Sequence, residues 1–163
     1  MAASVTEVEI RRSTPDEAGV LTDLAHASKR YWGYPESYIQ LWKRDLTFKP
    51  GYIERNAVYA AVYKGAVVGV FAVTGGGAEC ELAHLWVLPE WIGKGLGRKL
   101  FDEAVRVAGT IGAKTMRIVS DPNAEGFFRR MGARHVGYFP SKPDGRKLPY
   151  LVINLAAREK SRG

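Results

Sequence analysis

Three glycines at alternating positions constrain this chain more than any other feature of its sequence. They lie in Trp91-Ile-Gly93-Lys-Gly95-Leu-Gly97-Arg98, which joins a mostly apolar run, residues 79–88, to a stretch with helical periodicity that ends at Gly112. Because glycine has no side chain, consecutive backbone N–H groups of such a loop can close around an anion, and the helix dipole adds to the attraction. A lone glycine is more typical of a plain turn. Three of them beside Lys94 and Arg98 favour an anion-binding loop.

Two familiar phosphate-binding motifs also place glycines between a strand and a helix, and neither fits. The dinucleotide fingerprint requires a glycine where Arg98 stands, and it usually follows the first strand of its unit. The nucleotide-binding P-loop requires Gly-Lys followed by Ser or Thr, whereas Lys94 is followed by Gly95. Asp121, at the end of the next predicted strand, is the feature that leaves a nicotinamide or flavin ligand as a weak alternative.

The remaining sequence predicts elements in the order β-α-α-β-β-β-α-β-α-β-β. Val8 and Ile10 alternate with charged residues, as in a half-buried strand. Thr14-Pro15-Asp16-Glu17 then combines an N-cap, a proline in the first turn and a capping-box glutamate. A shorter helix begins near Pro35, and Lys49-Pro50-Gly51 is expected to end it. The later elements are a hairpin (57–63 and 66–74), a central strand (79–88), a helix (96–111), a strand (116–120), a helix (121–131) and two strands (134–139 and 148–155).

This order predicts an α/β fold with a single mixed sheet and helices on both faces. Its N-terminal half would be antiparallel, and a parallel crossover would follow residue 88. Ligands of such sheets bind at the carboxyl ends of parallel strands. We therefore expect the site around residues 85–97 and 119–128.

Length and composition exclude several classes of protein. The 163 residues, 46% of them hydrophobic and 25% charged, are typical of one globular domain, expected over residues 1–163. No apolar run approaches the ~20 residues that cross a bilayer, and the N-terminus resembles no signal peptide, so we expect a cytoplasmic protein that binds no membrane. Cys80 has no second cysteine to pair with, and the spacing of His26, His84 and His135 matches no zinc motif, so no metal is expected. The net charge of +7 favours an acidic partner, but the basic residues are dispersed and match no nucleic-acid-binding motif.

Two segments together resemble the GCN5-related N-acetyltransferase (GNAT) family. LWVLPEWIGKGLGR, residues 85–98, is similar to the family's pyrophosphate loop, and DPNAEGFFRRMG, residues 121–132, is similar to its second cofactor motif. Both motifs in this order and spacing are specific, and the order of elements agrees along the whole chain. The resemblance implies that acetyl-coenzyme A is the acetyl donor, bound where the strands ending near Val87 and Ser120 splay apart.

The resemblance also implies which residues hold this cofactor. Its pyrophosphate would lie on the amides of residues 93–98, and its pantetheine arm would pair along residues 85–87 with Asn123 beside it. The expected cofactor-binding residues are Leu85, Trp86, Val87, Ile92, Gly93, Lys94, Gly95, Leu96, Gly97, Arg98, Asn123, Phe127 and Phe128. The alternative for Asn123 is a residue that stabilises its own helix start.

Two positions depart from the family's pattern. Ile92 stands where the family usually has Gln or Arg, although the backbone amides remain. Phe128 stands where the family often has a tyrosine that protonates the leaving thiolate. Tyr138 or a water could supply that proton, or the thiolate could leave unassisted, since a thiol pKa near ~8.5 allows this near neutral pH.

A general base is expected, because an amine attacks a thioester only when neutral and an alkylamine is almost entirely ammonium at pH 7. Glu81 lies eleven residues before Ile92, like the catalytic glutamate that acts through water in some histone-modifying members of the family. An exposed strand glutamate is the alternative. His84 is the second candidate, with a hydrogen-bonded structural histidine as its alternative. Strict alternation places Glu81 and His84 on opposite faces of the strand, so both could serve one substrate only across a bulge. The amide of Val87 is the expected oxyanion donor.

The acceptor side corresponds to the first two helices, about residues 14–46. Their aromatic residues, Tyr31, Trp32, Tyr34, Tyr38 and Trp42, could hold a substrate ring or a cation, or could equally form a helix–helix core. Cys80 is expected to be buried packing. We therefore expect transfer of an acetyl group from acetyl-coenzyme A directly to a primary amine, of a small molecule or a protein, in a ternary complex. The alternative is a non-catalytic acyl-coenzyme A binding module, and a homodimer is compatible with either.

Overall fold

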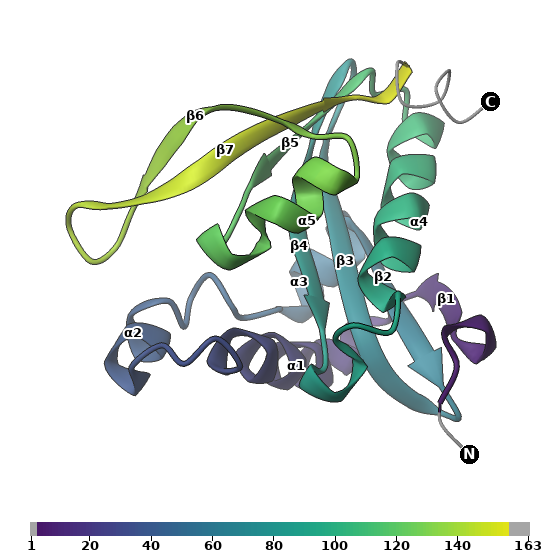
Figure 1. Ribbon diagram of the computed structural model, residues 1–163. Helices are drawn as coiled ribbons and strands as arrows, with labels where there is room; N and C mark the ends of the chain where they lie inside the picture. Colours follow the sequence, from purple (N-terminus) through teal and green to yellow (C-terminus); the bar gives the residue numbers. More distant parts are fainter. Residues whose placement is uncertain (1–2, 157–163) are drawn as a thin grey trace. The chain divides into compact units, whose positions relative to one another are not determined.

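The computed structural model describes residues 3–156. The elements follow the predicted order with one added helix (Figure 1). The strands are β1 (Glu9–Arg12), β2 (Ala57–Tyr63), β3 (Ala66–Gly76), β4 (Glu79–Val87), β5 (Thr115–Val119), β6 (Arg134–Ser141) and β7 (Arg146–Asn154). The α-helices are α1 (Ala18–Arg30), α2 (Glu36–Leu41), α3 (Pro50–Arg55), α4 (Leu96–Thr110) and α5 (Glu125–Arg130). Short 3-10 turns are η1 (Val5–Glu7), η2 (Pro15–Glu17), η3 (Pro89–Trp91) and η4 (Pro122–Ala124).

Within residues 3–156, seven strands are hydrogen-bonded in the order β1-β2-β3-β4-β5-β7-β6. β4 and β5 are parallel, whereas β1 with β2, β5 with β7 and β6 with β7 are antiparallel. This mixed sheet with one parallel pair and helices around it confirms the predicted fold class. No helix of the described residues is long and apolar enough to span a bilayer.

The chain divides into two compact units. The first contains the residues up to Ala72 together with His84–Asp102, and the second contains Val73–Ala83 and the residues from Glu103 onward. Strands β3 and β4 and helix α4 each contribute residues to both units.

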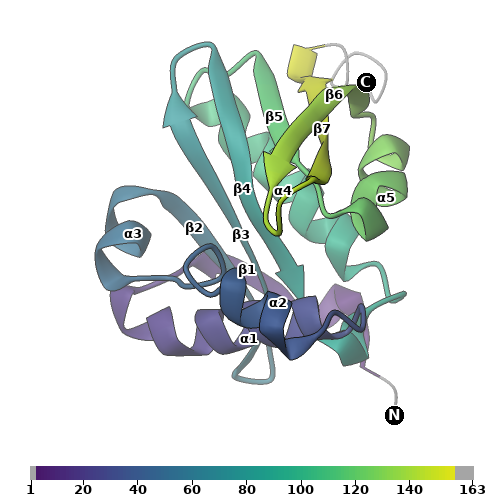
Figure 2. The same cartoon turned by 90° about the vertical axis from the view of Figure 1, so that its left-hand side faces the viewer.

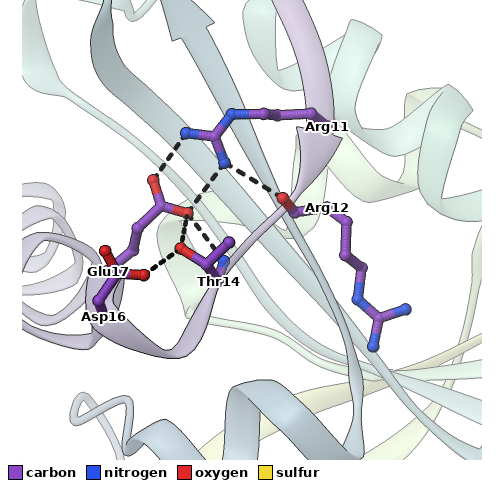
Figure 3. Close-up of polar contacts among 5 residues, drawn as sticks. All are labelled: Arg11, Arg12, Thr14, Asp16 and Glu17. Atoms are coloured by element: carbon purple, nitrogen blue, oxygen red, sulfur yellow. Dashed lines mark hydrogen bonds and ion pairs between the residues drawn. The ribbon is translucent and has the colours of Figure 1, made fainter.

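The first unit begins with the predicted capping motif. The Thr14 hydroxyl and the Glu17 carboxylate form a reciprocal capping box at η2, and α1 follows directly (Figure 3). α1 and α2 lie side by side (Figure 2), and their apolar residues form one buried cluster with Phe48, Ile53 and Val58. The Lys64-Gly65 turn of the β2–β3 hairpin has positive φ at both positions, 47° and 80°.

Helix α3 was not expected from the sequence. The prediction that Lys49-Pro50-Gly51 ends the second helix was wrong, because α2 already ends at Leu41 and Pro50 is the first residue of a new helix. Proline is well tolerated there, since the first N–H groups of a helix have no partner within the helix. The short helix buries Ile53 in the core of the unit.

The second unit contains the parallel pair and the C-terminal hairpin. Glu79–Glu81 of β4 pair with Thr115–Arg117 of β5, and β7 lies between β5 and β6. Figure 1 shows β6 and β7 as a long two-stranded hairpin. Its pairing has a register shift between His135 and Gly137. Helix α5 presents Phe128 to the core of this unit.

Candidate active site

The glycine loop lies in the first unit, between η3 and helix α4. Gly93 and Gly95 have φ angles of 80° and 85°, which L-residues with side chains rarely adopt. A Cβ atom built at Gly93 meets nothing within 4 Å, and one built at Gly95 meets only Val5 Cγ1 at 3.9 Å. The protein therefore requires glycine here for its backbone conformation, and the space beside both residues is open.

The first turn of α4 has backbone donors that no group within the helix accepts. The N–H groups of Leu96, Gly97 and Arg98 begin the helix and have no partner within it. The N–H of Lys99 is the first to be satisfied, by the carbonyl oxygen of Gly95 at 3.1 Å. Such a helix start, with the positive end of the helix dipole, fits a phosphate group.

Buried side chains hold both ends of the loop. The Trp91 ring is buried and packs edge-on against Tyr63, with 5.0 Å between ring centroids. On the helical side, Leu96 is fully buried, and Lys99 Nζ donates to the carbonyl oxygens of Val5 (3.0 Å) and Val8. Among the basic residues around the loop, Lys99 therefore has a structural role, whereas the side chains of Lys94 and Arg98 are exposed.

The end of β4 leads into the loop. In the described part of the chain, β4 pairs with β5 only over Glu79–Glu81, so Leu85, Trp86 and Val87 lie beyond the paired stretch. These three residues are partly exposed. Their backbone groups on that edge are not used by β5 in this register.

His84 is held as a neutral ring with a defined tautomer. The indole Nε1–H of Trp86 donates to His84 Nδ1 at 2.9 Å, and because an indole nitrogen can only donate, Nδ1 must carry a lone pair. The imidazole lies 4.4 Å from the Phe48 ring and edge-on to Tyr52 at 5.9 Å, measured between centroids. Burial lowers the pKa of His84 to about 4. The proton of the neutral ring is therefore on Nε2.

The predicted aromatic cluster separates into two groups. Tyr31 and Trp32 are exposed and contact each other edge-on, with their centroids 5.1 Å apart. Trp42 is buried in the core, and Tyr34 and Tyr38 pack edge-on against it. The cluster thus contains both a core residue and partly exposed rings.

A buried lysine joins this second group of rings. Lys29 is only 7% exposed, and its Nζ lies 4.6 Å from the Trp42 ring centroid, 5.1 Å from that of Tyr34 and 6.0 Å from that of Trp86. An ammonium over several aromatic faces is stabilised by their quadrupoles. Sequence reasoning missed Lys29, since nothing in the helical pattern of α1 distinguishes it from a surface lysine.

In the second unit, Glu81 and Cys80 occupy the paired part of β4. Glu81 is partly exposed and in register with Arg117, which donates to Glu79 at 2.9 Å. Cys80 is fully buried, and burial raises the pKa of its thiol to about 11. The expectation that Cys80 is packing is therefore confirmed.

The second predicted motif forms the start of η4 and α5. The Asp121 carboxylate accepts from the backbone N–H of Asn123 at 2.8 Å and from its side-chain amide at 2.9 Å. Asn123 thus stabilises its own turn, which is the alternative that the sequence left open. Phe128 is 6% exposed, with its ring edge-on to Phe127 at 5.2 Å.

Tyr138, one candidate for the proton donor, lies on β6 and is 64% exposed. Its ring contacts His135 edge-on, with 4.8 Å between centroids. His135 Nδ1 in turn lies 2.8 Å from a carboxylate oxygen of Glu125. Within the described residues, no three His, Cys, Asp or Glu side chains are grouped so that they could hold a metal ion.

Comparison with known proteins identifies the family. The sequence model of the Acetyltransferase (GNAT) family matches residues 21–133, which is more than half of the chain. The chain belongs to the GNAT family. The match includes the glycine loop and α5, so the prediction made from those two segments is confirmed. Acetyl-coenzyme A is the acetyl donor for GNAT acetyltransferases, in agreement with the predicted cofactor.

Individual GNAT relatives agree with this assignment. An uncharacterized N-acetyltransferase of Chlorobaculum tepidum is 34% identical over 87 residues, 52% of this chain and 55% of the relative, so the match spans about half the length of that protein. The PaiA N-acetyltransferase of Thermoplasma acidophilum, solved with coenzyme A, has a TM-score of 0.74 at 21% identity, covering 90% of this chain and 98% of that one. A GCN5-related N-acetyltransferase of Rhodopseudomonas palustris has a TM-score of 0.75 at 20% identity, covering 94% and 98%. At these identities the solved structures show a shared fold.

Proposed function

We propose that this GNAT protein moves an acetyl group from acetyl-coenzyme A directly to a primary amine in a ternary complex, with residues 1–163 acting as one acetyltransferase domain. The observation that carries the proposal is the glycine loop. Gly93 and Gly95 leave open space beside the free amides of the first turn of α4, and Trp91 and Leu96 anchor the loop in the core. These features fit a pyrophosphate. When bound, acetyl-coenzyme A would supply a thioester whose carbonyl carbon the amine attacks.

The chain's own groups have separate parts in this proposal. The amides of residues 93–98 would bind the pyrophosphate, with Lys94 and Arg98 as exposed counter-charges. The unpaired edge of residues 85–87 would bind the pantetheine arm, and the N–H of Val87 would donate to the thioester oxygen, where negative charge develops. Asn123 would lie beside the arm, and Ile92, Phe127 and Phe128 would contribute apolar surface.

Glu81 is the proposed general base, acting through water. Two observations support it over His84. The Glu81 carboxylate is partly exposed, and a carboxylate can take a proton without rearrangement. The Nδ1 lone pair of His84 is already used by Trp86 and its Nε2 carries the proton, so this ring would have to break a hydrogen bond before it could act as a base. Tyr138 is exposed enough to donate a proton to the thiolate, whereas Phe128 cannot.

The experiment that tests cofactor binding compares two glycine substitutions with the same strain. Gly95→Ala adds a methyl group at φ 85° in the loop, and Gly112→Ala adds one at φ 86° after the end of α4, where a Cβ meets nothing within 4 Å. Each should lose about 1–2 kcal/mol of stability because an L-residue is disfavoured there. Only Gly95→Ala should also weaken coenzyme A binding in calorimetry, by about tenfold or more, since its methyl group is added within the proposed phosphate-binding loop. Equal affinity in both variants would contradict the loop assignment.

The experiment that tests the reaction measures thiol release from acetyl-coenzyme A with a panel of primary amines. We expect turnover in the wild type and a loss in kcat of about 10²–10⁴ in Glu81→Gln, with little change in cofactor affinity. Glu79→Gln is the matched control, because Glu79 shares the strand face of Glu81 and is ion-paired with Arg117. Equal losses in both variants would remove Glu81 from the base role. Coenzyme A binding without turnover of any amine would favour the non-catalytic binding module.

A further inference from the structure

We propose that His84 is a hydrogen-bond donor that positions the acceptor substrate, so that the acceptor is a primary amine which also carries a carboxylate or amide oxygen. This inference rests on the proposed function and adds the substrate class. The oxygen would accept from His84 Nε2–H. The experiment below compares amino acids with their amides and so shows which of the two oxygen types the site prefers.

The first support is that Trp86 Nε1, which can only donate a hydrogen bond, determines the tautomer of His84. Trp86 Nε1 has a hydrogen and no lone pair available for acceptance, so it must donate across the 2.9 Å contact to Nδ1. Alternation along β4 places residues 84 and 86 on the same strand face, so the backbone itself sets up this contact. Movement of the proton to Nδ1 would put two N–H groups against each other.

The second support is that neighbouring rings pack against the imidazole in this arrangement. Phe48 lies against it at 4.4 Å and Tyr52 packs edge-on at 5.9 Å, both measured between centroids. A flip about the Cβ–Cγ bond would exchange Nδ1 for a C–H group and leave the Trp86 indole without its acceptor. Burial keeps the imidazole neutral down to the acid range, because it lowers the pKa of His84 to about 4.

The third support is that Nε2 is available. Among residues 3–156, Trp86 is the hydrogen-bond partner found for the His84 ring, and the buried side-chain atoms without a partner are Ser13 Oγ and His26 Nε2. His84 Nε2 is thus neither paired nor sealed from solvent. It is a neutral, oriented N–H group on a partly exposed surface that includes the Tyr52 and Trp86 rings. Such a group discriminates between substrates by hydrogen bonding, because a bound amine that lacks the oxygen leaves this N–H group without a partner.

The test compares three amines that share one skeleton: 2-phenylethylamine, phenylalaninamide and phenylalanine, with ethylamine, alaninamide and alanine as a smaller series. Initial rates at saturating acetyl-coenzyme A give kcat/KM for the wild type, His84→Gln and His84→Met. Glutamine retains an N–H donor near the position of Nε2 but is not a base, and methionine has no donor. Because the basicity of each amine is the same for all three enzymes, the ratio of kcat/KM between oxygen-bearing and oxygen-free amines isolates the effect of residue 84. Coenzyme A affinity and thermal unfolding confirm that each variant is folded.

We expect His84→Met to lower that ratio by about tenfold or more, the value of a lost hydrogen bond to a polar substrate group, and His84→Gln to stay within about threefold of the wild type. The amide and carboxylate arms then show which oxygen is preferred. An unchanged ratio in His84→Met overturns the proposal. Equal loss in both variants on every amine also overturns it and makes His84 the base.

A nuclear magnetic resonance measurement decides the geometry without any turnover. In ¹⁵N-labelled protein at pH 7, the His84 ring should show a protonated Nε2 and an unprotonated Nδ1, and Trp86→Phe should allow the other tautomer to appear. A protonated Nδ1 or an imidazolium ring in the wild type overturns the proposal even if acetylation occurs. Conversely, the expected tautomer with no amine acetylated would leave His84 as described and contradict the proposed function.

Discussion

Glu17 provides a direct test of how the structure stabilises its N-terminal helix. Its carboxylate accepts two hydrogen bonds from the Arg11 guanidinium, at 2.9 and 2.8 Å, and one from the backbone N–H of Thr14 at 2.9 Å (Figure 3). The hydrogen bonds from Arg11, aided by that of Thr14, lower the pKa of Glu17 from 4.5 to about 2, against the opposing effect of burial. We predict that Glu17→Gln destabilises the protein at neutral pH.

The magnitude follows from this change in pKa and from exposure. A fall from 4.5 to about 2 corresponds to about 3 kcal/mol if all of it acts on folding. The Arg11 side chain is 42% exposed, however, so solvent screens part of the interaction. A capping interaction of this kind typically contributes about 1 kcal/mol. We therefore expect Glu17→Gln to lower the free energy of unfolding by about 1–2 kcal/mol at pH 7.

The pH dependence has a definite sign. A carboxylate with a lowered pKa in the folded state contributes its full stability above the unfolded pKa, here 4.5, and loses it as the pH falls toward the folded value, about 2. The difference between wild type and Glu17→Gln should thus be constant above pH 5 and should shrink between pH 4.5 and 2. Urea unfolding followed by tryptophan fluorescence at pH 7, 5, 4 and 3 measures it.

Glu36→Gln is the matched control. Glu36 pairs with Arg30 across the same sequence separation, at 2.7 Å. Both of these side chains are solvent-exposed, however, and Glu36 takes no part in the Thr14 capping box. We expect its effect to be clearly smaller than that of Glu17→Gln. An equal effect of the two substitutions, or a Glu17→Gln effect that does not diminish below pH 4.5, would refute the argument that the partly buried capping carboxylate is the stabilising group.

Two further predictions concern packing. Gly69→Val should lower stability by about 1–3 kcal/mol in thermal unfolding, because a Cβ there would lie 2.8 Å from Leu100 Cδ1 and 3.4 Å from Ala61 Cβ. Gly69→Ala should lower stability less, since the Leu100 methyl group can move to admit a single Cβ. Equal losses in the two variants would contradict this prediction. The Cys80 thiol, buried and with its pKa raised to about 11, should resist a disulfide reagent at pH 8 in the folded protein and react fully in urea, so that rapid labelling of native protein would contradict its burial.

The parts of the fold that the sequence predicted well have local causes. The Thr14–Glu17 capping box, the Lys64-Gly65 turn and the glycines before α4 each depend on residues within a few positions of one another, and all three are found. The error at Pro50 has a local cause as well. Proline is found both just after a helix and in the first turn of a helix. The residue type alone therefore does not distinguish a helix break from the start of α3.

The acceptor-side residues could not be predicted in the same way, because their roles depend on contacts between distant elements. Burial lowers the pKa of His84 to about 4. Of the rings that pack against it, Phe48 and Tyr52 come from segments more than thirty residues away. One clue was nevertheless present. A histidine and a tryptophan two positions apart in a strand share a face, and an indole N–H beside an imidazole can only donate to it. The chemical role of His84 therefore depends on its neighbours on the same strand face as well as on its residue type.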